Sequence, residues 1–395
     1  MFSIVDHNPR TRIVFGDGAL NRLGELAVQL GAKRVLLVTD PGIVAAGHAQ
    51  RAVQLLEASG IIVSIFDQVR ENPTTACIDR CLEAARVSSI QAIVGLGGGS
   101  SLDTAKGCNF LLTNGGRMED YWGVGKASHP MLPLIAVPTT AGTGSECQSF
   151  ALIANEKTHQ KMACGDPKAA ARVAILDPQL TISQPPRVTS CTGIDAIAHA
   201  VETAVTRKRN LLSDMLAREA FKLCATSFAP VLKNPDDLLS RGRMLFGAAL
   251  AGLAIENSML GAAHAAANPL TAHFDLVHGQ AVGMMLPFIV RFNSSNPEAR
   301  HGYAELASAT EIACVSEGLD QAVDALIARL NSLLDAAGMP RSLAECGVKK
   351  EMIPVLADES AKQWTAGFNP RAVSREDFAR LFEEAWQGRG DGDGF

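Results

Sequence analysis

The sequence predicts a parallel α/β domain followed by an all-helical domain. A chain of 395 residues is long for a single core and suits two domains. Up to about residue 177, short β-branched runs alternate with amphipathic stretches, which is typical of βαβ units with helices on both faces of a parallel sheet. After Pro185 and Pro186, Ala- and Leu-rich helical patterns dominate. We therefore place the α/β domain at 1–183 and the all-α domain at 184–395.

The first domain opens with a buried strand at 34–39, a helix at 45–59, a second strand at 61–66 and a second helix at 74–86. Strands at 92–96 and 132–137 continue the series. We expect two further runs, 149–155 and 171–176, to extend the same sheet. In the second domain the longest apolar run, 244–255, is shorter than a bilayer-spanning helix and predicts a buried helix.

Charge and cysteine usage narrow the class of protein. A net charge of -5 without a cluster of Lys or Arg argues against a nucleic-acid partner and against a polybasic membrane anchor. The nine cysteines are scattered and form no CxxC pair. Together with an N-terminus that lacks a secretory pattern, they predict reduced thiols in a cytoplasmic protein.

A strand, a glycine turn and the start of a helix follow one another at 92–106. Gly97, Gly98 and Gly99 let backbone N–H groups approach a pyrophosphate, and the following helix adds its positive N-terminal end. The pattern is not the GxGxxG fingerprint of a standard Rossmann domain. An ordinary glycine-rich turn with no ligand is the alternative.

A second polar turn, 138–146, follows the next buried strand. Its hydroxyls and glycines add donors at the carboxyl edge of the sheet, where ligands of open α/β sheets bind. Two helix caps with flexible turns are the alternative. Asp40, at the end of the first strand, could accept a hydrogen bond from a ribose 2′-OH, which favours NAD over NADP. The alternative for Asp40 is an Asp-Pro-Gly turn in which it caps the next helix.

Three histidines and one aspartate suggest a metal site in the second domain. Asp195 and His199 are four residues apart on a predicted helix, so both point from one face. His264 and His278 lie in apolar surroundings further along the chain. Three imidazoles and a carboxylate suit Fe²⁺ or Zn²⁺ with an open position for substrate. The alternative is that each histidine is a hydrogen-bonded core residue.

The sequence resembles the iron-dependent (group III) alcohol dehydrogenases, relatives of glycerol dehydrogenase and dehydroquinate synthase. The resemblance runs over nearly the whole chain and is carried by the motifs at 71–74, 97–106, 138–146, 175–178, 193–202, 261–279 and 369–371. It implies a dehydroquinate synthase-like fold, with an N-terminal dinucleotide-binding domain, a helical metal-binding and substrate domain, and an active site in the cleft between them.

The resemblance also implies a ligand set. It assigns the metal, Fe²⁺ with Zn²⁺ as a possibility, to Asp195, His199, His264 and His278. It assigns the dinucleotide, NAD, to Asp40, Asn72, Gly98, Gly99, Ser100, Asp103, Thr139, Thr140, Thr143 and Lys161. For Lys161, an ordinary solvated charge in a hairpin is the alternative.

One position departs from the family pattern. Many members carry a histidine four residues after the third metal ligand, where it is thought to relay the alcohol proton. Here that position is Asn268, whose amide can hydrogen-bond a hydroxyl but cannot exchange a proton near neutral pH. We expect either His273 to act as the relay instead or His273 to be a structural or exposed residue.

The implied activity is that of a metal-dependent, NAD-linked oxidoreductase that interconverts a small primary alcohol or diol and its aldehyde or ketone. One alternative is a dehydroquinate synthase-like lyase, although residues 257–283 contain no Lys or Arg for a phosphorylated acid. Another is a transhydrogenase with tightly held nicotinamide. The resemblance further favours a homodimer or larger homo-oligomer.

Overall fold

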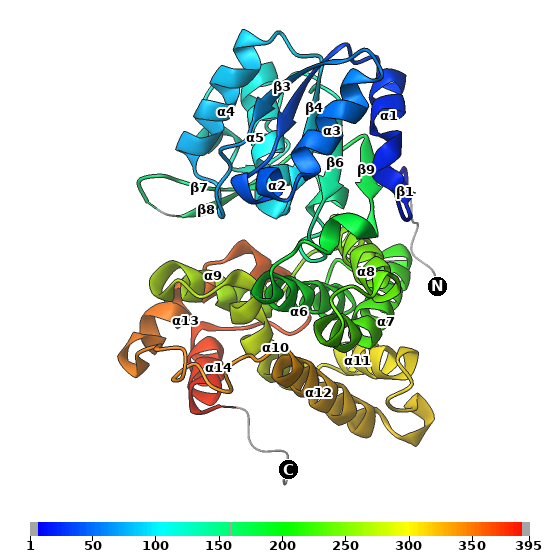
Figure 1. The fold of residues 1–395 in the computed structure, drawn as a ribbon. Coiled ribbons are helices and arrows are strands. Elements are labelled where there is room, and N and C mark those ends of the chain that lie inside the picture. Colours follow the sequence, from blue (N-terminus) through cyan, green and yellow to red (C-terminus); the bar gives the residue numbers. More distant parts are fainter. Residues whose placement is uncertain (1–6, 159, 389–395) are drawn as a thin grey trace. The chain divides into compact units, whose positions relative to one another are not determined.

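The protein divides into two compact units in a computed structural model that describes residues 7–158 and 160–388. The first unit, which we call the α/β unit, ends at Gln184, and the second, the helical unit, begins at Pro185. Each unit has its own elements, and Figure 1 shows them as ribbons.

The α/β unit contains a six-stranded sheet whose neighbouring strands all run parallel, in the order β1-β9-β6-β4-β2-β3. This confirms the predicted parallel sheet. The strands are β1 (Arg12–Phe15), β2 (Arg34–Val38), β3 (Ile62–Phe66), β4 (Ala92–Gly97), β6 (Leu134–Pro138) and β9 (Val173–Leu176).

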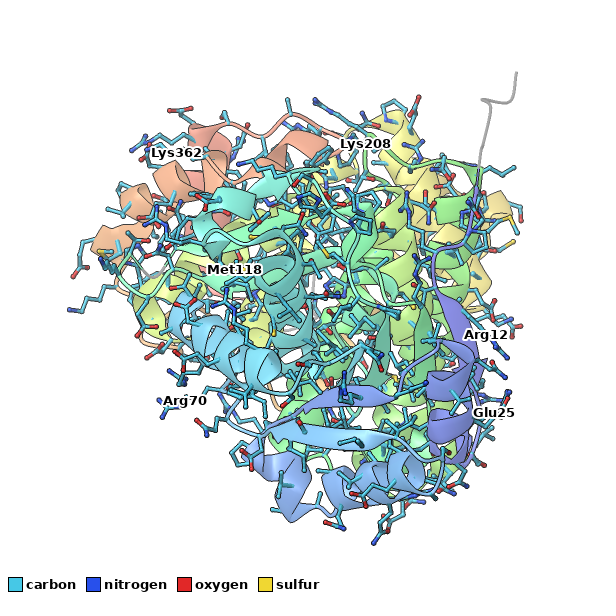
Figure 2. The ribbon with its side chains drawn as sticks, turned by 90° about the horizontal axis from the view of Figure 1, so that it is seen from above. Arg12, Glu25, Arg70, Met118, Lys208 and Lys362 are labelled. Carbon is cyan, nitrogen blue, oxygen red and sulfur yellow. The ribbon has the colours of Figure 1, made fainter. Side chains whose placement is uncertain are left out.

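Helices cover both faces of this sheet (Figure 1). Because side chains alternate along a strand, Leu37 of β2 packs with the helices of one face and Leu36 with those of the other. Charged residues such as Glu25 and Arg70 remain exposed (Figure 2). The helices are α1 (Leu23–Gln29), α2 (Pro41–Ala45), α3 (His48–Glu57), α4 (Thr75–Val87) and α5 (Gly99–Asn114).

Two expectations about this unit need correction. The run at 149–155 does not extend the main sheet: β7 (Phe150–Ala154) pairs antiparallel with β8 (Lys161–Gly165), and β5 (Gly123–Val124) completes a separate three-stranded sheet. The short connection between β7 and β8 suits a hairpin and cannot make a parallel crossover. The helix expected at 45–59 is divided at Gly47, whose φ of 80° lies in the left-handed region.

The helical unit contains no strand among its described residues, as the sequence predicted. Its helices are α6 (Pro186–Thr203), α7 (Leu211–Lys233), α8 (Leu238–Asn257), α9 (Ala262–Phe274), α10 (His278–Asn293), α11 (Pro297–Ala309), α12 (Leu319–Ala336), α13 (Ile353–Ala361) and α14 (Arg375–Gln387). Short 3₁₀ turns join several of them, including η8 (Trp364–Phe368), which packs against α9.

Helix α8 is longer than the apolar run at 244–255 suggested. It has 20 residues, and its most apolar 18-residue window makes it long and apolar enough to cross a membrane by length and composition. However, 67% of that stretch is buried inside the protein, where α8 packs against α6 and α7. Its burial, rather than its length, is therefore what identifies it as a core helix.

Candidate metal centre and nucleotide-binding turns

Helix α6 supplies the first two residues of a buried polar cluster. Asp195 and His199 are one turn apart, and His199 Nε2 lies 3.6 Å from Asp195 Oδ1. Both are about 5% exposed, although the rest of this helix is packed with Ala, Ile and Val. Two ionisable side chains in such a place need charged or metal partners, because an isolated charge is costly to bury.

Helices α9 and α10 bring two more histidines to the same place. His264, in the first turn of α9, puts Nε2 3.5 Å from the same Asp195 oxygen. The ring centroids of His199 and His264 are 4.8 Å apart, and that of His278, the first residue of α10, lies 5.4 Å from that of His264. The structure thus gathers all four predicted ligands.

Ligand atoms of Asp195, His199 and His264 lie within 4.8 Å of one another, as a metal site requires. Asp195 Oδ1 and His264 Nε2 are buried, and neither has a hydrogen-bond partner of good geometry among the residues that the structure describes. A carboxylate and neutral imidazoles are ligands that Fe²⁺ and Zn²⁺ accept. The residues present therefore fit a first-row divalent metal.

Glu202 is a functional residue that our reading of the sequence missed. It is buried, its Oε2 lies 2.5 Å from His264 Nδ1, and its Oε1 accepts from the backbone N–H of Ala263. In the neutral form of His264 that a metal would bind, Nδ1 donates to Glu202 and Nε2 keeps its lone pair on the side of Asp195. The signal was available: Glu202 is seven residues after Asp195, on the same helical face.

The electrostatics of the cluster follow from burial and from its opposite charges. Burial alone would raise the pKa of Asp195, but the imidazoles of His199, His264 and His278 hold that pKa well below its ordinary value. Burial lowers the pKa of His264, but the carboxylates of Glu202 and Asp195 outweigh this effect and raise that pKa to about 9.

Glycine and asparagine residues hold these helices in place. A Cβ on Gly279 would lie 2.0 Å from the carbonyl oxygen of Cys191, so only glycine lets the start of α10 approach α6 this closely. Asn369 accepts from the backbone N–H of Ala262 and is hydrogen-bonded to Asn293, which fixes the first turn of α9. The late motif at 369–371 thus holds the helix turn that carries His264.

The two candidates for the proton relay lie in different places. Asn268 is one turn beyond His264 on the same face of α9, and its Nδ2 donates to Gln363 Oε1 at 2.9 Å. His273 is nine residues beyond His264, on the opposite face, where its exposed ring is paired with Glu359 of α13 at 3.0 Å. This position fits the alternative of an exposed histidine, and a relay through His273 stays a prediction.

In the α/β unit, the two glycine turns pack directly against each other. A Cβ on Gly99 would lie 2.7 Å from Thr143 Cγ2, and one on Gly98 would lie 3.3 Å from Thr140 Cγ2. Gly97, at φ 149°, has a backbone conformation that residues with side chains rarely adopt. Gly98 caps the N-terminus of α5 without a side-chain hydrogen bond. This end of α5 keeps backbone donors for an anion.

A buried polar network connects the helix after the first glycine turn with the second turn, 138–146. Asp103 accepts from Ser145 Oγ at 2.7 Å and from the backbone N–H of Leu152 at 3.2 Å. Lys106, which is fully buried, donates to the Ser145 carbonyl at 2.6 Å and to the Phe150 carbonyl at 2.8 Å. Thr139, also predicted to bind the cofactor, is buried and bonded through its backbone N–H to the Gly97 carbonyl. Asp103 therefore positions the second turn.

The remaining predicted cofactor residues surround the same turns. Asp40 caps α2 by accepting from the backbone N–H of Ile43 at 3.1 Å, and it also accepts from Ser101 Oγ. Asn72 has a left-handed φ of 51° and donates its backbone N–H to Ser100 Oγ. Lys161, at the start of β8, contributes a positive charge that lowers the pKa of Asp103, although burial raises this pKa overall.

Comparison with known proteins agrees with both halves of this description. The model of the family "Iron-containing alcohol dehydrogenase" matches residues 9–178, and that of "Fe-containing alcohol dehydrogenase family, C-terminal" matches residues 189–386. Alcohol dehydrogenase 4 of Schizosaccharomyces pombe is 34% identical over 372 residues, which cover 94% of this chain and 87% of the yeast protein.

Solved structures show the same likeness. A 1,3-propanediol oxidoreductase superimposes with a TM-score of 0.93 at 32% identity, covering 97% of this chain and 100% of the other. A sulfoacetaldehyde reductase from Bifidobacterium kashiwanohense, solved in complex with NAD⁺, gives 0.86 at 28% identity, covering 96% and 98%. With both family models matched and the metal-site residues gathered, this chain belongs to the iron-containing alcohol dehydrogenase family.

Proposed function

We propose that this protein is a metal-dependent, NAD-linked oxidoreductase that interconverts a small primary alcohol or diol and its aldehyde or ketone. The observation that carries the proposal is the buried cluster of Asp195, His199 and His264, in which two facing ligand atoms have no hydrogen-bond partner among the described residues. A divalent metal held by such a cluster would polarise an alcohol or carbonyl oxygen, which is the chemistry that the proposed reaction needs.

The reaction is a two-electron transfer. The alcohol carbon gives a hydride to the nicotinamide C4 of NAD⁺, the hydroxyl oxygen loses a proton, and the products are the carbonyl compound, NADH and a proton. A divalent metal held by Asp195, His199, His264 and His278 would supply Lewis acidity at the alcohol oxygen. Glu202 keeps His264 in the tautomer that such a metal needs. Asn268 offers a hydrogen bond to the substrate and leaves the proton to water.

The glycine turns are our proposed site for the pyrophosphate of NAD. The N-terminus of α5, which no side chain caps, provides backbone N–H donors, and the Asp103–Lys106 network holds the second turn against it. Asp40, as a partly exposed carboxylate at the end of β2, would accept from the ribose 2′-OH and repel a 2′-phosphate. Its capping of α2 does not compete with this role, because each carboxylate oxygen can accept more than one hydrogen bond.

Three further properties belong to the proposal. The ligand set fits Fe²⁺ and also Zn²⁺. We place the protein in the cytoplasm, a view supported by its nine free cysteines, seven of which are buried. We also propose a homodimer or larger assembly, which light scattering would test directly. Each of these proposals can fail without affecting the proposed reaction.

The deciding experiment measures NADH formation on protein stripped of metal and then given Fe²⁺ or Zn²⁺, with a panel of small primary alcohols and diols. We expect turnover that depends on the metal and that falls by at least ~10³-fold in His264→Ala, because a metal ligand is lost. Exposed His301→Ala is the matched control and should retain full activity.

Two other outcomes would contradict the proposal in different ways. Tight NAD binding without turnover on any alcohol or aldehyde would point to a lyase-type reaction. Nicotinamide that remains bound after purification and exchanges hydride only between two carbonyl–alcohol pairs would identify a transhydrogenase. Mass spectrometry of the purified protein, which detects nicotinamide that has stayed bound, separates the second outcome from the first.

A further inference from the structure

The amide of Asn268, which we propose bonds to the substrate, is paired with the amide of Gln363, a residue to which the proposed reaction gives no role. Asn268 is one turn, about 6 Å of helix rise, beyond His264 on the same face of α9. Gln363 immediately precedes η8, which packs against α9, and follows the exposed Lys362 at the end of α13 (Figure 2). Two segments about 95 residues apart in sequence thus meet through one neutral hydrogen bond.

The hydrogen bond between the two amides uses one polar group of each and leaves the other group of each. Asn268 Nδ2 donates to Gln363 Oε1, which leaves Asn268 Oδ1 as an acceptor and Gln363 Nε2 as a donor. Among the residues that the structure describes, neither of these two atoms has a hydrogen-bond partner, and both residues are partly exposed. The pair therefore presents an acceptor and a donor side by side.

Unpartnered hydroxyls accompany the pair. Thr271 is three residues beyond Asn268 on α9, and its buried Oγ1 has no hydrogen-bond partner among the described residues, although a helical threonine ordinarily bonds to the carbonyl four residues earlier. Thr365, two residues after Gln363 and 5% exposed, also has a buried Oγ1 without a hydrogen-bond partner among the described residues. Buried polar atoms without partners mark places that water or a polar ligand occupies.

We propose that the Asn268–Gln363 pair recognises a second hydroxyl on the substrate, so that the enzyme prefers neutral diols and hydroxyaldehydes over simple alcohols of the same chain length. This inference rests on the proposed function, because it places the first oxygen of the substrate at the metal-site residues. Asn268 follows His264 by one helical turn on the same face of α9, so a group bound at Asn268 lies on the side of the helix that carries the metal-site residues.

The chemistry of the pair explains why a hydroxyl is the group that fits. A hydroxyl donates and accepts at once, so it can donate to Asn268 Oδ1 and accept from Gln363 Nε2. It would fit equally well if both amides turned over together, because it can use either order of donor and acceptor. A sulfonate or carboxylate only accepts and a quaternary ammonium does neither, so each leaves part of the pair unsatisfied. An uncharged pair also offers such ions no counter-charge.

The test compares 1,3-propanediol with 1-propanol on metal-loaded enzyme. Gln363→Met keeps the side-chain length but removes the donor and acceptor. We expect the ratio of kcat/KM for the diol to that for propanol to fall about tenfold, the effect of one hydrogen bond, while the propanol value changes by less than about twofold. Glu359→Gln, one turn earlier on α13, is the control and should leave the ratio unchanged.

A second measurement does not depend on turnover. Saturation-transfer NMR on the Zn²⁺-loaded protein without NAD should show a diol signal that weakens in Gln363→Met and a propanol signal that does not. If alcohols are oxidised but the ratio is unchanged, the recognition proposal is wrong and the proposed function stands. If nothing is oxidised but the diol signal still weakens in Gln363→Met, the proposed function is wrong and the recognition proposal stands. If nothing is oxidised and the diol signal is unchanged, both are wrong.

Discussion

At the scale of single residues, the two units rely on charged side chains buried far from bulk water. Glu202 and His264 form such a pair in the helical unit, and Asp103 and Lys106 form another in the α/β unit. Buried pairs add little net stability, because the desolvation cost offsets most of the attraction, but they fix geometry. Their value here is the orientation of a ligand atom and of a turn.

Glu202→Gln tests the orientation of His264. The amide oxygen can still accept from Ala263, but the amide N–H₂ would then face His264 Nδ1 and drive the imidazole proton to Nε2, where it blocks the metal lone pair. We expect metal affinity to fall about 10- to 100-fold, the range typical of such supporting residues. Competition with a chromophoric chelator measures this loss, and the same change at Glu219, an exposed residue of α7, should show none. Unchanged affinity would mean that Glu202 only packs the core.

Glu146, in the second glycine turn, predicts a pH dependence of stability. Burial raises its pKa from 4.5 to about 7, so the folded protein prefers the protonated acid. The stabilisation is fully present below about pH 4.5 and is lost as the pH rises through about 7. As the pH rises across this window, the free energy of unfolding of Glu146→Gln should therefore increase relative to that of the wild type by up to about 1.4 kcal/mol per pH unit. Above the window the difference should stay constant. Urea unfolding at pH 5, 6, 7 and 8 measures the difference, and a gap that does not change with pH would contradict the prediction.

At the scale of elements, the metal centre depends on how closely helices approach. Gly279→Ala would place a methyl group 2.0 Å from the Cys191 carbonyl and push the start of α10, with His278, away from α6. We expect reduced metal affinity and a loss of about 1–3 kcal/mol in stability, the usual effect of overpacking. Gly367→Ala meets nothing within 4 Å and is the control. Thermal unfolding and metal titration report the two effects, and a variant that keeps wild-type metal affinity would show that α10 can shift freely.

The elements also show where sequence reasoning succeeds and where it stops. The i, i+4 spacing of Asp195 and His199 put both on one face, but no local pattern brings His264 and His278 to them; only the family resemblance did so. The run at 149–155 is a strand as expected, but the prediction that it joins the main sheet was wrong. A buried apolar run has the same pattern whichever sheet it belongs to. The opposite-face position of His273 could have been read from its nine-residue spacing to His264.

At the scale of the whole molecule, the residues proposed for the two binding tasks lie in different units. The residues proposed for NAD all precede Gln184, and those proposed for the metal all follow Pro185. The change of hydrophobic pattern near the Pro185-Pro186 pair predicts this division of the chain, because parallel βαβ units and Ala-rich helices have different hydrophobic periods. Each ligand should then stabilise mainly the unit that carries its residues.

Hydrogen exchange followed by mass spectrometry tests that separation. Zn²⁺ added to stripped protein should slow exchange in α6, in the first turn of α9 and at the start of α10, because bound metal suppresses local opening of the helices that carry its ligands. NAD should slow exchange at 97–106 and 138–146, where its phosphates would engage backbone N–H groups. Asp195→Asn should abolish only the first effect. Protection of 97–106 by the metal alone, or loss of the NAD effect in Asp195→Asn, would show that the two sites are built as one.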